Sequence, residues 1–284
     1  MKSAAIISKP TKPELQTLVP EVAAWLRQRG YQVWFDHESV AYAPSESGVE
    51  RSELGTKQLD FAVVLGGDGT LLSAARAVAP HHVPILGVNL GSLGFLTEVP
   101  LSELYPTLEA VDAKQCAFER RGMIRCELVR NKERLAAWDA LNDAVVNKSA
   151  IARLVNFDVS LDDNFVANYK ADGVIVATPT GSTAYSLAAG GPILMPSVDG
   201  MVVTPVCPHS LTHRPFVVRD TIEISIVVRS AGEEAFLSID GQVGTPVMDG
   251  DRVLCRKSQY YTQLLRMRKT FFDVLRSKLK MGQR

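Results

Sequence analysis

The chain has 284 residues, enough for one large domain or two ordinary domains around a hydrophobic core. Its composition is that of an ordinary globular protein, and its 31 basic residues balance its 31 acidic residues, so no overall charge points to nucleic acid or a membrane surface as a partner. The 4 cysteines lack C-x-x-C spacing, which argues against a disulfide framework or a zinc site and predicts a cytoplasmic protein.

The first third of the sequence alternates between strand and helix patterns. Apolar residues recur at helical spacing from Leu15 to Leu26, and the polar segment 44–55 is predicted to be a mobile loop. The other predicted elements are strands at 4–7, 31–35, 61–65 and 83–88 and a helix at 70–78. This order predicts a doubly wound α/β domain with a Rossmann-like parallel sheet, whose ligands bind at the carboxyl ends of the strands.

From about residue 118 short alternating strands take over, separated by turn-rich segments. The predicted strands lie at 124–129, 154–161, 216–218, 222–228, 235–239 and 251–255. We therefore expect an α/β domain at 1–117 and a β-rich, β-sandwich-like domain at 118–264. Residues 265–284 contain a basic helical pattern and are expected to pack back on the first domain.

Three glycines surround a single carboxylate in the sequence VVLGGDGTLL. Gly66, Gly67 and Gly69 would let the backbone take positive φ angles and let a ligand approach the main chain. A helix that begins at Thr70 presents free N–H groups to a phosphate. The segment lacks the lysine of the P-loop and the spacing of G-x-G-x-x-G, so it predicts a phosphate-donor loop of another kind.

Asp68 stands where an anion site would not favour a negative charge. One interpretation is a helix cap made by its side-chain oxygen. Another is a proton acceptor for the attacking hydroxyl in phosphoryl transfer, and a third is a ligand for a divalent cation. The residues alone leave these roles open.

A second glycine loop, residues 87–96, follows the next predicted strand. Neighbouring strand ends in a doubly wound sheet line the same crevice, so both loops are expected to face one ligand. Phe95 of this loop is expected to lie in the core.

Two further segments carry polar groups suited to a nucleoside. Asn142 and Asp143 stand in an apolar surround and could bind ribose hydroxyls or an adenine edge, although an Asx turn explains them equally well. Residues 169–192 read as strand, turn and helix start, with Ser182, Thr183 and Ser186 crowding the turn and a tyrosine available for stacking on a base.

Other catalytic patterns are absent from the sequence. There is no G-x-S-x-G nucleophile elbow. His209 and His213 stand four apart, but no H-E-x-x-H glutamate accompanies them, so we interpret them as ordinary hydrogen-bonding residues. No metal ligands are predicted.

The turn GGDGT at 66–70, the pair Asn142-Asp143 and the segment TPTGSTAY at 178–185 resemble the NAD kinase family, in that family's order along the chain. The glycine-aspartate turn alone also resembles diacylglycerol-type lipid kinases and phosphofructokinases. The other two segments narrow the resemblance to NAD kinases, and it spans the chain from about residue 61 to residue 242.

The resemblance implies transfer of the ATP γ-phosphate to the 2′-hydroxyl of the adenosine ribose of NAD, with Asp68 as proton acceptor and Mg²⁺ held largely by phosphates and water. It also implies a homodimer or homotetramer and a site between the two domains. The NAD-binding residues that it implies are Asp68, Gly69, Asn142, Asp143, Arg153, Lys170, Asp172, Thr183, Ala184, Tyr185, Ser186, Leu187, Ala188 and Gln242.

Three positions depart from residues that are frequent in the family: Asp143 replaces Glu, Lys170 replaces Arg and Ala188 replaces Ser. These departures leave the preference between NAD and NADH open. Two alternatives also stay open. One is a lipid or sugar kinase that shares only the glycine-aspartate turn, and the other is a non-catalytic NAD-binding sensor, against which the charge of Asp68 argues.

Overall fold

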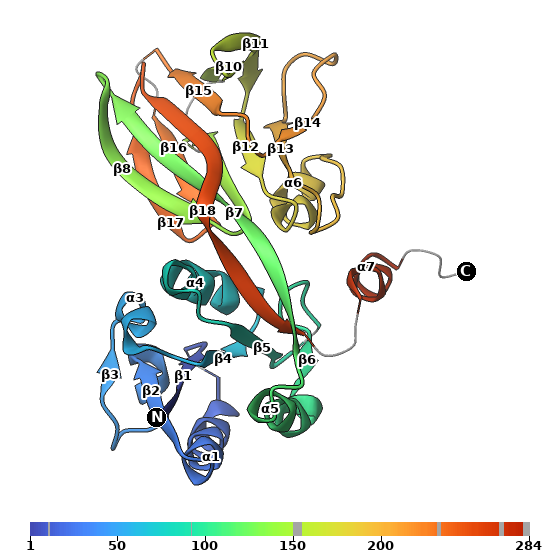
Figure 1. Cartoon of the computed structure of the whole chain (residues 1–284). Coiled ribbons are helices and arrows are strands. Elements are labelled where there is room, and N and C mark those ends of the chain that lie inside the picture. The colour runs from blue at the N-terminus through green and yellow to red at the C-terminus, as the bar shows by residue number, and fades with distance from the viewer. Residues whose placement is uncertain (11, 92, 150–154, 232–233, 267–269, 281–284) are drawn as a thin grey trace. The chain divides into compact units, whose positions relative to one another are not determined.

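The computed structural model describes residues 1–10, 12–91, 93–149, 155–231, 234–266 and 270–280, and Figure 1 shows their elements. The chain forms two compact units. The first contains residues 1–120 and 261–284, and the second contains residues 121–260. Two long strands, β7 (Ala117–Arg130) and β18 (Arg252–Arg266), run from one unit into the other.

The first unit is built on a parallel sheet in the order β3-β2-β1-β4-β5, with β6 and the end of β18 also pairing with β5. Its strands are β1 (Lys2–Ser8), β2 (Tyr31–Asp36), β3 (Gly48–Val49), β4 (Phe61–Gly66), β5 (Ile85–Asn89) and β6 (Val99–Pro100). The order reverses between β1 and β4, as in a doubly wound fold, so the predicted fold class is confirmed for this unit.

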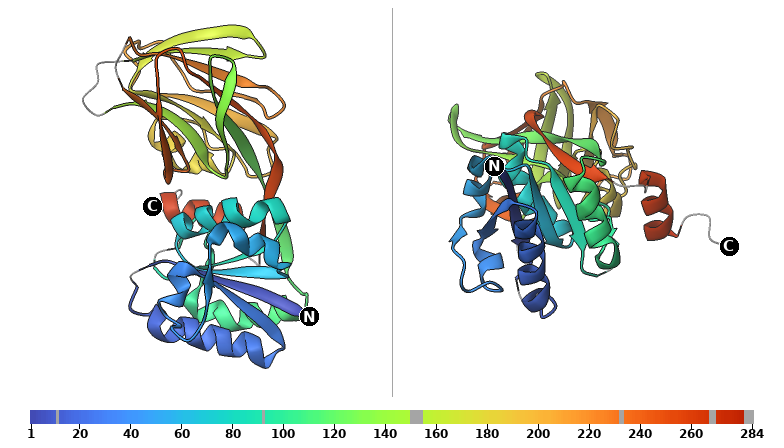
Figure 2. Two further views of the ribbon diagram at one scale, coloured as in Figure 1. Left: turned by 90° about the vertical axis from the view of Figure 1, so that its left-hand side faces the viewer. Right: turned by 60° about the horizontal axis from the view of Figure 1, so that its bottom comes forward.

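Helices cover both faces of this sheet (Figure 2). Apolar residues of α1 (Leu15–Gln28) and α5 (Leu104–Asp112) share one core with Ile6 of β1. Helix α4 (Asp68–Val78) contacts β1 and β4 from the opposite face. Because successive side chains of a strand point to opposite faces, strands covered on both sides are apolar throughout. All six residues of β4 are buried for this reason.

The predicted loop at 44–55 instead contains β3, α3 (Arg51–Leu54) and the start of the 3-10 turn η1 (Gly55–Lys57), and the short helix α2 (His37–Val40) precedes it. A buried polar cluster holds this segment. Asp36 is fully buried, its Oδ1 accepts from the Ser39 amide at 3.0 Å, and its Oδ2 accepts from Arg51 Nε at 2.9 Å. The prediction was wrong because these partners are far apart in the polar sequence.

The second unit is a β-sandwich. One sheet has the order β11-β10-β15-β18, continued by β7 and β8, and the other has the order β14-β13-β12-β9-β16-β17. The β-rich prediction is confirmed, although several strands were missed. The bounds are β8 (Glu133–Ala140), β9 (Asp143–Lys148), β10 (Val155–Leu161), β11 (Asn164–Ala171), β12 (Gly173–Ala177), β13 (Gly200–Val206), β14 (Phe216–Arg219), β15 (Ile224–Arg229), β16 (Ala235–Ile239) and β17 (Val243–Val247).

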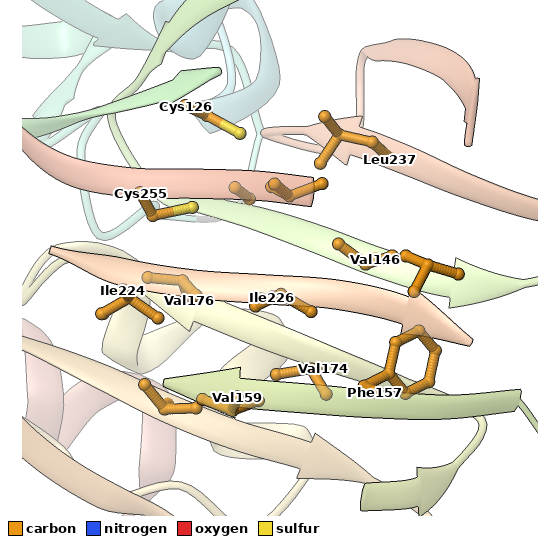
Figure 3. Packing of buried hydrophobic residues seen from close by; sticks show 14 of the residues in the cluster. Cys126, Val146, Phe157, Val159, Val174, Val176, Ile224, Ile226, Leu237 and Cys255 are labelled. Atoms are coloured by element: carbon orange, nitrogen blue, oxygen red, sulfur yellow. The ribbon is translucent and has the colours of Figure 1, made fainter. Parts of the chain in front are cut away.

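Apolar side chains from the two sheets fill the interior of the sandwich (Figure 3). Phe157 and Ile226 contribute from one sheet, and Val146, Val174 and Leu237 contribute from the other. The inward residues alternate with partly exposed ones along β10 and β15, which is the pattern of strands with one solvated face. This core fixes the loops that leave its strands.

The remaining described elements are short or terminal: the 3-10 turns η2 (Ala79–His81), η3 (Leu101–Glu103) and η4 (Gly181–Thr183), and the helices α6 (Tyr185–Ala188) and α7 (Phe271–Leu279). Helix α7 belongs to the first unit. Among the described residues, no helix is both long and apolar enough to cross a membrane.

We expect the substitution Phe157→Ala to lower the free energy of unfolding by about 3–5 kcal/mol, because it leaves a cavity in a closely packed core. Phe157 is fully buried, whereas Phe165 on the neighbouring strand is 66% exposed and serves as the control. Denaturant unfolding measures both variants. A Phe157→Ala effect as small as that of Phe165→Ala would contradict this account of the core.

Candidate functional site

A pocket of about 330 Å³ lies in the first unit at the carboxyl ends of β1, β4 and β5. This is the point at which the strand order reverses, where doubly wound sheets bind their ligands. Both glycine loops predicted from the sequence contribute to it, so the expectation that they face one pocket is confirmed. Its lining residues are Lys9, Lys12, Gly66, Gly67, Asp68, Asn89, Leu90, Gly91, Gly94 and Lys278.

The carboxylate of Asp68 is held by the second glycine loop. Oδ1 accepts from the amides of Leu96 and Thr97 at 3.1 and 2.9 Å and from Thr97 Oγ1 at 2.9 Å. Oδ2 accepts from the Phe95 amide at 2.8 Å. A carboxylate oxygen has about two lone-pair sites, so Oδ2 keeps one site for a further donor.

Close approach between the two loops explains a glycine at position 94. A Cβ there would lie 2.7 Å from Asp68 Cγ and 2.5 Å from Thr97 Oγ1, distances that real Cβ atoms do not show. The loop is tied further by Asn89, whose Nδ2 donates to Thr97 Oγ1 at 2.9 Å and whose Oδ1 accepts from the Gly91 amide at 2.6 Å. The pocket wall is therefore a connected network.

The glycines beside Asp68 matter because they lack a side chain, and none of them has a positive φ angle. Gly66 ends β4, Gly67 has a φ of −119°, and Gly69 lies inside α4, so none of the three uses the positive φ angles that glycine permits. A Cβ at Gly66 would lie 2.5 Å from Thr70 Oγ1, whereas a Cβ at Gly67 would meet no atom within 4 Å. Gly67 therefore leaves room beside the main chain at the start of α4.

Asp68 does not cap α4 with its side chain. The helix begins at Asp68, two residues earlier than predicted, its N-cap is Gly67, and no side-chain capping hydrogen bond is present there. The carboxylate points to the loop of residues 95–97 instead, so the helix-cap interpretation was wrong. Its negative charge still lies in the first turn, where the helix dipole favours it.

In the second unit, the Asn142-Asp143 pair and the turn at 178–183 are brought together through their backbones. The Thr178 amide donates to Asn142 O at 2.8 Å, and Thr178 Oγ1 donates to Leu141 O at 2.6 Å. A Cβ at Gly181 would lie 2.5 Å from the carbonyl carbon of Asn142. Only glycine allows this contact, which fixes the two predicted segments side by side.

Asp240 is a site residue that the sequence analysis missed. Its carboxylate accepts from three consecutive amides, those of Leu141, Asn142 and Asp143, at 3.2, 2.7 and 3.2 Å. The predicted residue Gln242 follows in the same turn and is exposed. The sequence IDGQ gave a turn signal, but nothing local indicated that the aspartate binds a segment about one hundred residues away.

Burial raises the pKa of Asp143 to about 7, and the charge of Asp240 contributes to the same shift. Burial also raises the pKa of the Tyr185 phenol, and the charges of three neighbours raise it further. Those neighbours are Cys207, Asp172 and Asp143. Tyr185 itself is 42% exposed, so its ring is accessible beside the polar pair.

The predicted residues around the end of β11 are on the surface. Asp172 is partly exposed and pairs with Lys148 Nζ at 3.4 Å. Lys170 is exposed, and its carbonyl accepts from the His209 amide at 2.8 Å. His213 packs edge-on against Tyr169, with ring centroids 4.7 Å apart. Neither histidine is drawn into a catalytic arrangement.

The hydroxyls of the tyrosine segment serve its own structure. Ser186 is fully buried and its Oγ lies 2.9 Å from Thr204 Oγ1, while Ser182 Oγ donates to Pro179 O at 2.6 Å. Thr183 Oγ1 donates to Thr180 O at 3.1 Å. Other predicted residues of this segment keep accessible atoms. They are Ala184, Tyr185, Leu187 and Ala188.

Arg153, also predicted as a ligand residue, lies outside the described residues. In the part of the chain that the structure describes, no group of three or more His, Cys, Asp or Glu side chains could hold a metal ion. The four cysteines are free thiols.

Each unit therefore offers one kind of binding chemistry. The first combines a helix N-terminus, an open glycine and three lysines around a fixed carboxylate, which suits an anionic phosphate beside a group that loses a proton. The second combines an amide, a buried acid near neutrality and an accessible aromatic ring, which suits a nucleoside.

Two family models match the chain. The ATP-NAD kinase N-terminal domain matches residues 4–115, and the ATP-NAD kinase C-terminal domain matches residues 141–267. The chain is 62% identical over 284 residues to the NAD kinase of Koribacter versatilis and 50% identical over 285 residues to that of Acidobacterium capsulatum. Both matches cover 100% of either protein.

Solved structures give the same result. Yeast NADH kinase complexed with NADH has a TM-score of 0.89 at 25% identity, covering 100% of this chain and 89% of that one. An NAD kinase from Archaeoglobus fulgidus in complex with ATP has a TM-score of 0.80 at 25% identity, covering 99% of this chain and 100% of that one. These matches cover the second unit as well as the first. A kinase that shared only the glycine-aspartate turn would match the first unit alone.

We expect Gly94→Ala to break the contact between the two loops of the first unit, because its Cβ would overlap Asp68 and Thr97. Overpacking of this kind costs about 1–3 kcal/mol. Hydrogen exchange measures it locally, and the amides of residues 95–97 should exchange about tenfold faster or more. Gly122→Ala is the control, since its Cβ would meet no atom within 4 Å. Unchanged protection at 95–97 would contradict this account.

We expect Asp143 to make stability depend on pH. Its pKa rises from 3.8 to about 7 in the folded state, so the folded chain holds this proton more tightly than the unfolded chain. The stability that this proton adds is fully present below about pH 4, the unfolded pKa. It declines above that pH and is lost as the pH rises through about 7, the folded pKa. Relative to Asp143→Asn, the wild type should lose on the order of 2 kcal/mol between about pH 5 and pH 8.

Denaturant unfolding at several pH values measures this difference. The exposed Asp163, changed to Asn, is the matched control. Parallel pH profiles for the wild type and Asp143→Asn would show that Asp143 titrates in the folded state as it does in the unfolded chain.

Proposed function

The chain belongs to the NAD kinase family, and we propose that its first unit holds the phosphates of ATP while its second unit binds NAD. It is an ATP-dependent kinase that phosphorylates NAD to NADP. The observation that supports the division between the units is the chemistry of their sites. The carboxylate and the phosphate-binding backbone lie in one unit, and the nucleoside-binding groups lie in the other.

We assign proton removal to Oδ2 of Asp68. Its four hydrogen bonds leave the carboxylate in one position, and Oδ2 is the oxygen with a lone pair to spare. The reacting ribose hydroxyl is a poor nucleophile, so a fixed acceptor contributes by positioning as well as by taking the proton. The same hydrogen bonds hold the carboxylate on the loop of residues 95–97, and the dipole at the start of α4 would still attract phosphate.

The donor phosphates are assigned to the glycine turn, with Gly66, Gly67, Gly69 and Thr70 forming the phosphate-donor loop. The positive end of the α4 dipole would attract phosphate oxygens, and the open side of Gly67 would admit them. We propose Mg²⁺ as the accompanying cation. The described residues contain no cage of ligands, which fits an ion held mainly by phosphates and water, and the ion would neutralise charge on the transferred group.

NAD is assigned to the accessible groups of the second unit. Asn142 can both donate and accept, and Asp143, with a pKa of about 7, can do the same near neutral pH. Tyr185 offers a ring for stacking on the adenine. Asp172 is proposed for the nicotinamide end. The other proposed contacts, each carried over from the family resemblance, are Arg153, Lys170, Thr183, Ala184, Ser186, Leu187, Ala188 and Gln242.

We further propose a cytoplasmic enzyme that forms a homodimer or homotetramer and binds neither nucleic acid nor membranes. The four free thiols fit a reducing compartment. The oligomeric state rests on the family resemblance.

The test is formation of NADP from NAD, ATP and Mg²⁺ by the wild type and by Asp68→Asn. The amide cannot accept the proton, so we expect kcat to fall by about 10²- to 10⁴-fold while the Kd for NAD stays within about twofold. Asp163→Asn, in an exposed turn, should keep full turnover. Near-normal turnover by Asp68→Asn, with an unchanged melting temperature, would reduce Asp68 to a structural role.

A further inference from the structure

Three lysines from separate parts of the chain line the pocket of the first unit. Lys9 and Lys12 follow β1, and Lys278 stands in the last turn of α7. We propose that these lysines bind the triphosphate of ATP and that Lys278 is the residue through which α7 completes the donor site. This inference rests on the proposed function and adds binding residues beyond the glycine turn.

The segment that carries Lys9 and Lys12 is held in place by a buried tyrosine. The hydroxyl of Tyr42 donates to Lys9 O at 3.2 Å and accepts from the Lys12 amide at 3.0 Å, and the Tyr42 side chain is 6% exposed. The Lys9 amide donates to Leu65 O at 3.0 Å, directly before the glycine turn. Both lysines are thus attached to a fixed backbone beside the phosphate-donor loop.

Helix α7 is also well defined at its start. The Thr270 hydroxyl and the Asp273 carboxylate form a capping box, and Val274 and Leu275 are buried. Lys278 follows Leu275 by three residues, which is nearly one helical turn. It therefore lies on the same side of the helix as the buried residues. Among the basic residues of this helix, Arg276 pairs with Asp273, whereas Lys278 lines the pocket.

The charges around the pocket favour a polyanion. Among the described residues, neither Lys9 nor Lys278 has an acidic partner within ion-pair distance. Lys12 forms an ion pair of 3.5 Å with Glu14, whose side chain is partly exposed. The one acidic residue of the lining is Asp68, whose carboxylate already accepts four hydrogen bonds. Three lysines, of which only Lys12 has an acidic partner among the described residues, form a site for several phosphate groups.

Lysine suits this role because its ammonium group is a compact charge with three donors on a flexible stem. A triphosphate presents oxygens over a longer span than one helix N-terminus can bind, so side chains from the segment after β1 and from α7 would hold the parts that the glycine turn cannot reach. Surface lysines in general are solvated and bind nothing. The convergence of three on one cavity, from positions 9, 12 and 278, distinguishes this set.

The experiment is steady-state kinetics of Lys278→Ala with ATP and NAD varied separately. Loss of one charge-assisted contact to phosphate in a partly exposed site should raise KM for ATP about five- to tenfold. KM for NAD and kcat should stay within about twofold, because Lys278 would touch neither the acceptor nor the proton. Inorganic tripolyphosphate, tested as a competitive inhibitor against ATP, should weaken by the same factor in this variant.

Two variants serve as controls. Lys280→Ala removes a charge from the same end of α7 outside the pocket lining and should leave KM for ATP unchanged. Lys278→Arg keeps the charge and should restore most of the affinity lost in Lys278→Ala. Added salt should raise KM for ATP more in the wild type than in Lys278→Ala, because screening acts on the charge that the variant lacks.

An unchanged KM for ATP in Lys278→Ala would overturn the inference, as would an equal rise in KM for ATP and for NAD. A rise in KM for ATP as large in Lys280→Ala as in Lys278→Ala would also overturn it. ATP binding would then depend on the overall charge of this end of α7 and not on a contact made by Lys278. The proposed function fails separately, if the wild type forms no NADP from NAD and ATP.

Discussion

The carboxylate of Asp68 accepts hydrogen bonds from the amides of three consecutive residues, 95–97, and from the hydroxyl of Thr97. This interaction joins the loop after β5 to the helix after β4 and closes the pocket wall between them. The parallel sheet places the two strand ends next to each other, but it does not determine the conformation of the loops. The hydrogen bonds of the Asp68 carboxylate hold the second loop in its conformation. The close approach of the two loops leaves room only for glycine at position 94.

The second unit uses the same device. Asp240 accepts from the amides of residues 141–143, again three in succession, and so shapes the segment that presents Asn142 and Asp143. Runs of backbone N–H groups are natural partners for a carboxylate, because each donor would otherwise need water or a strand partner. In both units an acid distant in the sequence orders a loop. In the second unit that loop carries groups assigned to substrate binding, whereas in the first unit the acid itself is the assigned group.

Much of this architecture was predictable from the sequence, because strand and helix periodicities are local. The alternation before residue 118 gave the doubly wound unit, and the segments GGDGT and TPTGSTAY pointed to the sites. The failures involve distant partners. The segment after β2 is ordered by a buried ion pair between Asp36 and Arg51. Gly66 avoids steric overlap with Thr70 and does not supply a positive φ angle. No local sequence pattern indicates that Asp240 binds the amides of residues 141–143. None indicates that Lys278 lines a pocket formed mostly by residues 9–94.

The buried carboxyl of Asp143 also has a consequence for calorimetry. With a pKa of about 7, this group is a mixture of protonated and ionised forms near neutrality. A ligand that contacts it would favour one form, so binding would take up or release a fraction of a proton. The measured heat would then vary with the ionisation enthalpy of the buffer, and the number of protons exchanged could be read from titrations in several buffers at one pH. That count would report which form of the acid the bound nucleotide selects.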